Sequence, residues 1–319
     1  MRTVLRHTFT AMGTDCAIVA GAAVPDAPLA RRAIGRALIE LKAQERALSR
    51  FDERSALSAL NAAAGRWVAV DERLLEAVAA AVAAREATGG RFDPTVLPAL
   101  VAAGYDRSYD RLRPRPAAPV RGWRAGAAID VDRERGRVRL AAGSAIDLGG
   151  IGKGLSAGVA LAAMRDVWPD LTGALIDLGG DIAVHGVAPD GSPWRIAVAD
   201  PRRAGARLGV LALTGGAVAS SGRDRRVLGA DGSGHHLIDP LTGRPAVPGP
   251  LAVTVVAPSA AEAEVHATAL AITPVDQVCE RLAARPWLAA LVVPATGRPF
   301  IAGDMPLLER SAELAGAVA

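Results

Sequence analysis

A glycine-rich stretch in the middle of the chain, Asp147-Leu-Gly-Gly-Ile-Gly-Lys-Gly154, combines residue types that suit an anion. Glycines let backbone N–H groups approach a ligand closely, and the N-terminus of the helix expected to follow favours phosphate. Lys153 adds a positive charge in a chain whose only other lysine is Lys42. The loop therefore predicts contact with a phosphate group. The alternative is a helix-entry loop whose glycines serve only the backbone.

Two familiar phosphate-binding loops do not fit this stretch. A P-loop needs glycine at the position of Asp147 and Ser or Thr at the position of Gly154. The dinucleotide-binding fingerprint opens a βαβ unit with a different glycine spacing. The sequence thus excludes both motifs and leaves the acidic start of the loop unexplained.

A second candidate site is the segment Glu264-Val-His-Ala-Thr268. On a helix, Glu264 and Thr268 are four residues apart and share a face. Carboxylate and hydroxyl oxygens suit Mg²⁺, which also keeps waters and ligand oxygens. His266 would point elsewhere, so it is not counted as a ligand. The alternative is a solvated glutamate and a packed threonine.

Two loops carry further candidates. His236 could act as a general base near neutral pH or could cap the turn that follows it, while Asp239 is expected to order that turn. Phe92 could stack on an aromatic ligand and Asp93 could accept a hydrogen bond from it, or both could anchor their loop.

The elements that must position these residues predict an α+β fold, with mixed or antiparallel sheets packed against helices. Short strands cluster between Ala174 and Ala257 without regular alternation with helices. Apolar spacing and capping residues predict the other elements. We expect a strand over Thr8–Ala20, a hairpin of Ile129–Val131 with Val138–Leu140, a surface loop over Arg107–Arg124, and helices over Arg31–Leu48, from Ser55, over Arg73–Thr88, Leu155–Trp168, Ala260–Ile272, near Pro274–Ala283 and over Leu307–Ala317.

Two short repeats suggest two similar half-units within one domain spanning residues 1–319. Ile146-Asp-Leu-Gly-Gly150 recurs as Ile176-Asp-Leu-Gly-Gly180, and Pro240-Leu-Thr-Gly-Arg-Pro245 recurs as Pro294-Ala-Thr-Gly-Arg-Pro299. Each repeat is short enough to reflect convergent turn chemistry instead.

The overall composition narrows the function classes. Half of the 319 residues are hydrophobic, and the net charge of +4 comes from scattered arginines, which does not favour nucleic-acid binding. The two cysteines have no metal-ligand spacing and form no disulfide framework. No signal peptide, lipobox or membrane-spanning run is evident. We therefore expect a cytoplasmic protein.

The motifs occur together in one order, and in this order they resemble the ApbE family, the FAD:protein FMN transferases. The resemblance covers nearly the whole chain and rests on Met12-Gly-Thr14, Leu48-Ser-Arg-Phe51 with Ser55 and Asn61, Phe92-Asp-Pro-Thr-Val96, Asp147–Gly154, Gly179-Gly-Asp181, Ser220-Ser-Gly222, His236-Leu-Ile-Asp-Pro240 with Thr242-Gly243, and Glu264 with Ala267-Thr-Ala-Leu270.

The resemblance implies an enzyme that cleaves the FAD pyrophosphate with Mg²⁺, moves FMN onto a Thr or Ser hydroxyl of a target flavoprotein, and releases AMP. It implies metal ligands at Glu264, Thr268 and the backbone carbonyl of Gly150. His236 would activate the acceptor hydroxyl, and Lys153 would offset developing negative charge. FAD would contact Met12, Phe51, Arg91, Phe92, Asp93, Asp147, Lys153 and Ile238.

Three departures from the family pattern qualify this interpretation. Glu264 stands where the family usually has aspartate, so metal affinity or choice is expected to differ. Ser220 replaces the usual threonine, and Arg223-Asp224 replaces an acidic-aromatic pair. Two other functions fit the same residues: a metal-dependent FAD pyrophosphatase giving FMN and AMP, and a flavin-binding protein without turnover.

Overall fold

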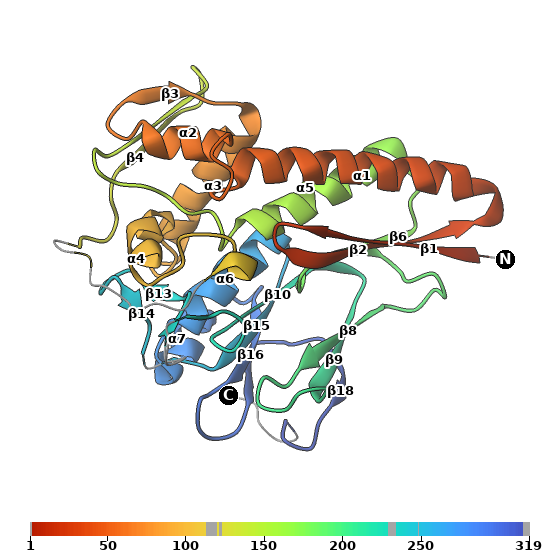
Figure 1. Ribbon diagram of the computed structural model, residues 1–319. Helices are drawn as coiled ribbons and strands as arrows, with labels where there is room; N and C mark the ends of the chain where they lie inside the picture. The colour runs from red at the N-terminus through yellow and green to blue at the C-terminus, as the bar shows by residue number, and fades with distance from the viewer. Residues whose placement is uncertain (1, 113–119, 121–122, 229–233, 248, 315–319) are drawn as a thin grey trace.

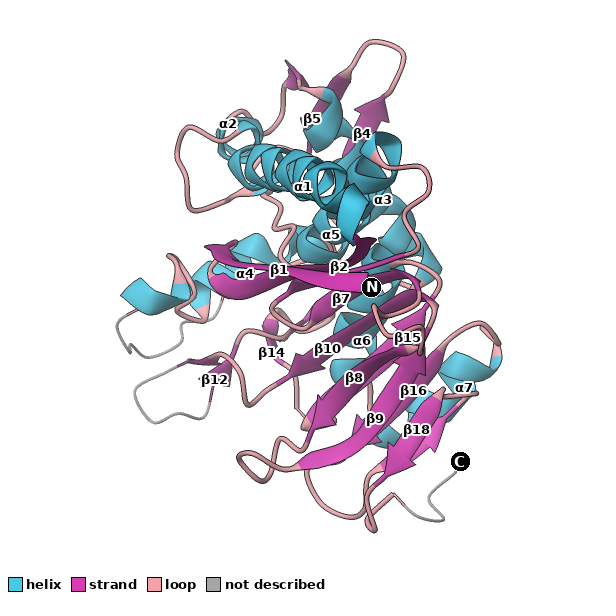
Figure 2. Cartoon of the chain, turned by 90° about the vertical axis from the view of Figure 1, so that its right-hand side faces the viewer, coloured by secondary structure: helices cyan, strands magenta, loops and turns pink. Residues whose placement is uncertain are grey.

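An eight-stranded antiparallel sheet lies at the centre of the fold (Figures 1 and 2). The computed structural model describes residues 2–112, 120, 123–228, 234–247 and 249–314. In spatial order the strands are β1 (Arg2–Ala11), β2 (Thr14–Ala23), β6 (Gly173–Leu178), β7 (Asp181–Gly186), β10 (Gly215–Gly222), β15 (Ala252–Ala257), β16 (Ala289–Val293) and β17 (Phe300–Ala302).

Three helices cover one face of this sheet: α1 (Ala27–Leu48), α5 (Gly152–Val167) and α6 (Ala260–Ala271) (Figure 1). Helix α1 buries Ala30, Ile34, Ala37 and Leu41, which recur every three or four residues and so form one apolar stripe. Alanine dominates the contacts of α5 and α6 as well, and small side chains let the helix axes approach the sheet and each other closely.

The opposite face of the large sheet packs against a three-stranded sheet of β18 (Leu307–Arg310), β9 (Arg207–Leu213) and β8 (Trp194–Ala199). Along β8, buried and exposed residues alternate, as expected for a strand with one face toward the core. Ile182 and Val184 of β7 join this second core.

Helices α2 (Ala56–Ala62) and α3 (Glu72–Ala87) pack with a second three-stranded sheet, which consists of β3 (Trp67–Ala69), β5 (Arg137–Leu140) and β4 (Ile129–Asp132). Side chains of Ser55 and Asp71 cap these helices by accepting from Ser58 and Leu74 N–H groups. The remaining described elements are α4 (Leu97–Ala102), α7 (Val278–Ala283), the pairs β11 (Val227–Leu228) with β12 (Gly234–His235) and β13 (Ile238–Asp239) with β14 (Arg244–Pro245), and the 3₁₀ turns Val24–Asp26, Pro94–Val96, Tyr109–Arg111 and Val275–Gln277.

The predicted α+β class is confirmed, and the predicted helices lie within a few residues of their observed ends, with one exception. The helix expected over Leu307–Ala317 is wrong, because Leu307–Arg310 pairs as strand β18 with β9. Residues 315–319 of that prediction lie outside the described residues. The single strand expected over Thr8–Ala20 is a hairpin of β1 and β2, which turns at Met12 and Gly13 with φ of 52° and 69°.

Part of the loop predicted over Arg107–Arg124 lies outside the described residues. The two copies of the Ile-Asp-Leu-Gly-Gly repeat are not structurally equivalent. The first precedes α5 without positive φ at its glycines, whereas the second ends β6 in a hairpin turn with Gly179 and Gly180 at φ of 72° and 99°.

Candidate functional site

The ammonium group of Lys153 lies between two buried carboxylates, those of Asp181 and Glu264, and forms an ion pair with each. Lys153 is in the first turn of α5, Asp181 begins β7, and Glu264 is in α6. Asp181 and Glu264 are only 4% and 2% exposed, while the Lys153 side chain is 18% exposed. The site is therefore an acidic recess whose accessible side is the lysine.

Close packing of two helices holds this recess together. A Cβ on Gly154 would lie 2.2 Å from the carbonyl oxygen of Ala260, so the backbones of α5 and α6 approach at a distance that no other residue permits. At the same point the Gly154 N–H donates to Glu264 Oε2 over 2.8 Å. Gly154, the last residue of the predicted phosphate loop, therefore helps to position Glu264.

Burial governs the protonation of these groups. It raises the pKa of Glu264 to about 7, although the positive charge of Lys153 lowers it. The carboxylates of Asp181 and Glu264 in turn raise the pKa of Lys153, so the lysine stays charged. Two carboxyl groups thus face one lysine, and a further cation at this site would favour the ionised form of Glu264.

The three expected metal-binding positions lie together. A Cβ on Gly150 would lie 3.3 Å from Thr268 Oγ1 and 3.1 Å from the ring of Phe92. Thr268 and Glu264 share one face of α6, and Ser221 Oγ lies 3.3 Å from Thr268 Oγ1. Among the described residues no group of three His, Cys, Asp or Glu side chains could hold a metal. Carboxylate, hydroxyl and carbonyl oxygens nevertheless fit Mg²⁺, which commonly takes only one or two carboxylates and completes its shell with water and phosphate oxygens.

Asp147, the first residue of the loop, is held by Arg50. Arg50 Nε lies 2.6 Å from Asp147 Oδ1, and the Gly149 N–H donates to Asp147 Oδ2 over 2.9 Å. The guanidinium also stacks on Phe51 and Tyr105, 4.1 Å and 4.6 Å from their ring centroids. Asp147 is thereby fixed before any ligand binds.

His236 lies beside this aromatic group, with its ring edge-on to Tyr105 at 6.5 Å. Burial, followed by the charge of Arg226, lowers the pKa of His236 to about 3. The imidazole is therefore neutral, as a base must be, but weakly basic. Its Nδ1 is buried without a hydrogen-bond partner among the described residues.

The other predicted FAD contacts are more widely spread. Phe51 is 43% exposed, whereas Phe92 and Ile238 are buried. Asp93 is also buried and accepts from the N–H groups of Thr95 and Gly126, both over 2.8 Å, so its carboxylate orders the loop.

Met12 and Arg91 have partners of their own. The Met12 N–H donates to Glu45 Oε1 over 2.5 Å, which fixes the left-handed turn of the first hairpin. Arg91 lies 4.0 Å from Asp239 Oδ1 and so links the Phe92 loop to the His236 turn.

Four residues of the site had no role assigned from the sequence. Asp181, Arg50 and Ser221 all lie inside recognised motifs, but local spacing does not reveal their partners. Tyr105 lies in no motif, and its place between Phe51 and His236 follows only from the fold.

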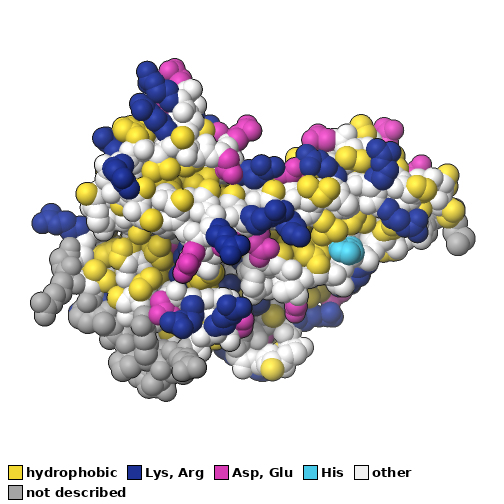
Figure 3. All heavy atoms as spheres, turned by 45° about the horizontal axis from the view of Figure 1, so that its top comes forward, with side chains coloured by type: hydrophobic (Ala, Val, Ile, Leu, Met, Phe, Trp, Pro, Cys, Tyr) yellow, Lys and Arg dark blue, Asp and Glu magenta, His cyan; other side chains and the backbone are white. Residues whose placement is uncertain are grey.

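On the face drawn in Figure 3, basic side chains are interspersed with acidic and hydrophobic ones. Among the described residues no helix is both long enough and apolar enough to cross a membrane.

Comparison with known proteins shows the family. The sequence profile of the ApbE family matches residues 12–292. This chain belongs to the ApbE family. A relative from Treponema pallidum, a FAD:protein FMN transferase, is 32% identical over 277 residues, covering 79% of this chain and 74% of the relative. Another FAD:protein FMN transferase, from Salmonella typhimurium, is 27% identical, and the match covers 82% of this chain and 76% of the Salmonella protein.

Solved ApbE structures share the fold. An ApbE protein from Thermotoga maritima superposes with a TM-score of 0.83 at 30% identity, covering 94% of this chain and 97% of its own. A flavin transferase ApbE from Vibrio cholerae superposes with a TM-score of 0.79 at 22% identity, and the match covers 95% of this chain and 98% of the Vibrio protein. At this identity the likeness supports only the fold. The predicted family and the predicted enzyme class, a transferase, are confirmed.

Proposed function

We propose that this ApbE-family chain is a Mg²⁺-dependent FAD:protein FMN transferase. The observation that carries the proposal is the lysine held between Asp181 and Glu264, next to Thr268 and Gly150. This arrangement offers one accessible cation and a set of hard oxygen ligands within the same recess. The names of the relatives supply the substrate, FAD, and the acceptor class, a protein.

Glu264, Thr268 and the Gly150 carbonyl would hold the metal, with the Asp181 carboxylate and the Ser221 hydroxyl nearby. Bound there, Mg²⁺ would neutralise charge on the pyrophosphate oxygens. Lys153 would approach the same oxygens, because its side chain lies on the accessible side of the recess. Asp147 and Phe51, both in contact with Arg50, would line the flavin end.

In the transfer step, the acceptor hydroxyl attacks the phosphorus of the FMN half. The new P–O bond forms as the bond to the AMP half breaks, and AMP leaves with the bridging oxygen. The hydroxyl proton passes to Nδ1 of His236, which is buried without a partner among the described residues. Burial is the main cause of the lowered pKa of His236, and the negative charges of bound FAD would offset two further causes, the charges of Arg226 and Lys153.

The test is to incubate the protein with FAD, Mg²⁺ and a candidate flavoprotein, and to measure both AMP release and the intact mass of the acceptor. Transfer predicts equal amounts of AMP and FMN-modified acceptor. AMP and free FMN without an adduct would identify a pyrophosphatase instead. Bound FAD without any AMP would leave a flavin-binding protein.

A further inference from the structure

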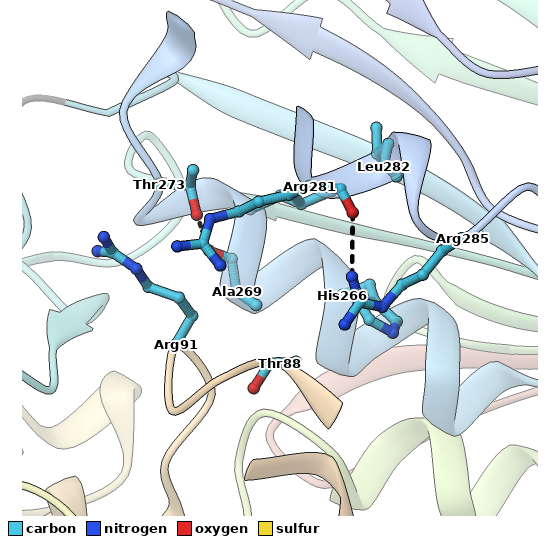
Figure 4. Close-up of a pocket in the computed structure, with 9 residues that line it drawn as sticks. Thr88, Arg91, His266, Ala269, Thr273, Arg281, Leu282 and Arg285 are labelled. Atoms are coloured by element: carbon cyan, nitrogen blue, oxygen red, sulfur yellow. Dashed lines mark hydrogen bonds between the residues drawn. The ribbon is translucent and has the colours of Figure 1, made fainter. Parts of the chain in front are cut away.

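A pocket whose lining does not include Lys153, Asp181 or Glu264 lies where the C-terminal end of α3, the helix α6 and the helix α7 meet (Figure 4). Three arginines line it: Arg91 from the loop after α3, Arg281 from α7, and Arg285 just beyond α7. Its floor is formed by buried residues, among them His266 and Thr273. His266 lies two residues from both Glu264 and Thr268 on α6 and so belongs to a different side of the helix, while Thr273 follows the end of α6.

The positive charges of this pocket are not balanced. Its lining contains no carboxylate. Within the described part of the chain, Arg281 forms no ion pair, and its Nε is buried without a hydrogen-bond partner. The carboxylate facing Arg91, that of Asp239, is 4.0 Å away. Glu280 acts on Arg281 only through space.

Arg285 is fixed by the backbone. It donates to the carbonyl of Ala87, at the end of α3, and over 3.0 Å to the carbonyl of Arg281. Figure 4 shows the Arg281 side chain extending across the pocket toward Thr273 and Arg91. The hydroxyls of Thr88 and Thr273 already donate to the carbonyls of Ala84 and Ala269, both over 2.8 Å. Among the described residues, the pocket donors without a hydrogen-bond partner therefore include the guanidinium Nε of Arg281.

Electrostatic repulsion within the pocket follows from this arrangement. Burial, followed by the charges of Arg91 and Arg285, lowers the pKa of Arg281. An arginine stays charged in a protein, so the repulsion persists in the free protein and an anion would relieve it. Planar guanidinium groups bind phosphate oxygens in pairs of hydrogen bonds, which gives such a pocket preference for oxyanions.

We propose that Arg281, together with Arg91 and Arg285, forms a binding site for a phosphate dianion; of the three arginines, only Arg91 is also an expected FAD contact. Two sources have this chemistry: free inorganic phosphate, and the terminal phosphate of a nucleotide such as AMP. Arg281 and Arg285 are not among the expected FAD contacts, so the inference is tested at Arg281 and does not depend on the proposed transferase activity.

The test compares the wild type with Arg281→Gln, and uses Arg31→Gln as the matched control because Arg31 is an exposed arginine of α1. Melting temperature and calorimetric binding are measured with inorganic phosphate, AMP and adenosine, at an ionic strength held constant with sodium chloride. We expect saturable binding of phosphate to the wild type and to Arg31→Gln. In Arg281→Gln the Kd should rise about tenfold or more. Without phosphate, Arg281→Gln should melt no lower than the wild type, since it removes repulsion.

Equal stabilisation of all three proteins by phosphate would overturn the proposal, because it would reflect a general salt effect. Absence of binding to the wild type by both inorganic phosphate and AMP would overturn it as well. AMP binding that depends on Arg281, without binding of inorganic phosphate, would support the site and assign it to a nucleotide. Similar binding of inorganic phosphate and AMP, without binding of adenosine, would support the site as one for free phosphate.

Discussion

The guanidinium of Arg50 lies 2.6 Å from the carboxylate of Asp147, and both side chains are largely buried, at 6% and 14% exposure. This ion pair connects the end of α1 to the glycine-rich loop before α5, which are far apart in the sequence. It fixes the acidic start of that loop before substrate arrives.

Replacing Arg50 tests this role. Arg50→Gln leaves Asp147 without its charged partner, and breaking a buried pair costs roughly 3 kcal/mol of unfolding free energy. Weaker FAD binding should accompany the loss, measured by flavin fluorescence. Arg50→Lys keeps the charge but loses the planar stacking on Phe51 and Tyr105, so its effect should be intermediate. Arg54→Gln, at an exposed position in the same segment, is the control, and equal effects at both positions would contradict this role.

Glu264→Gln removes one of the two carboxylates around Lys153 with little change of shape. If Glu264 is the proposed metal ligand, its loss should reduce AMP release on the order of 100-fold, by analogy with the sensitivity of metal sites to their supporting groups. Higher Mg²⁺ should restore part of the rate. A titration of rate against Mg²⁺ measures both effects, and an unchanged Mg²⁺ dependence would remove Glu264 from the metal site.

Gly154→Ala should separate α5 from α6. The added methyl would meet the backbone carbonyl of Ala260, which cannot rotate away, so we expect a loss of about 2 kcal/mol in unfolding free energy. Gly158→Ala is the matched control in the same helix, where a Cβ meets nothing within 4 Å. It should stabilise the protein by roughly 0.5–1 kcal/mol, because alanine favours a helix. Denaturant unfolding compares the two, and similar stabilities would show that the helices can move apart without cost.

His236 makes stability depend on pH. Above pH 6.5 the ring is neutral in both the folded and the unfolded chain, so its contribution is complete. As the pH falls below 6.5, the unfolded chain takes up a proton that the folded chain resists down to about pH 3, so stability is lost. Near pH 5 the loss should be about 2 kcal/mol. His236→Gln should show a smaller loss between neutral pH and pH 5, whereas His7→Gln, at an exposed position, should behave like the wild type.

His236→Ala tests the proposed proton acceptor. Removing a general base typically slows a reaction by about 100-fold or more, so formation of the FMN-modified acceptor should fall by that factor. FAD affinity should change much less, since His236 is not among the expected FAD contacts. Mass spectrometry of the acceptor over time gives the rate. Full activity of the variant would exclude His236 as the base.

Residues close in sequence were predictable, and partners from distant segments were not. The spacing of Glu264 and Thr268 on one helix and the cap at Ser55 follow from local rules and are present in the structure. Asp181 faces Lys153 only because β7 pairs between β6 and β10 beneath α5. The segment from Leu307 was predicted as a helix because its apolar residues suit either structure, and its partner β9 decides for a strand. Tertiary context therefore decided the residues that sequence reasoning missed.

The order of strands in the large sheet has a consequence for synthesis. Cys16 of β2 pairs with Leu178 of β6. Strand β2 can therefore pair with β6 only after more than half of the chain has been synthesised. Glu264 and Thr268 emerge from the ribosome later still. Contacts so distant in sequence form slowly. The recess around Lys153 is thus among the last parts of the protein to be completed, and a nascent chain cannot engage flavin there until α6 has been made.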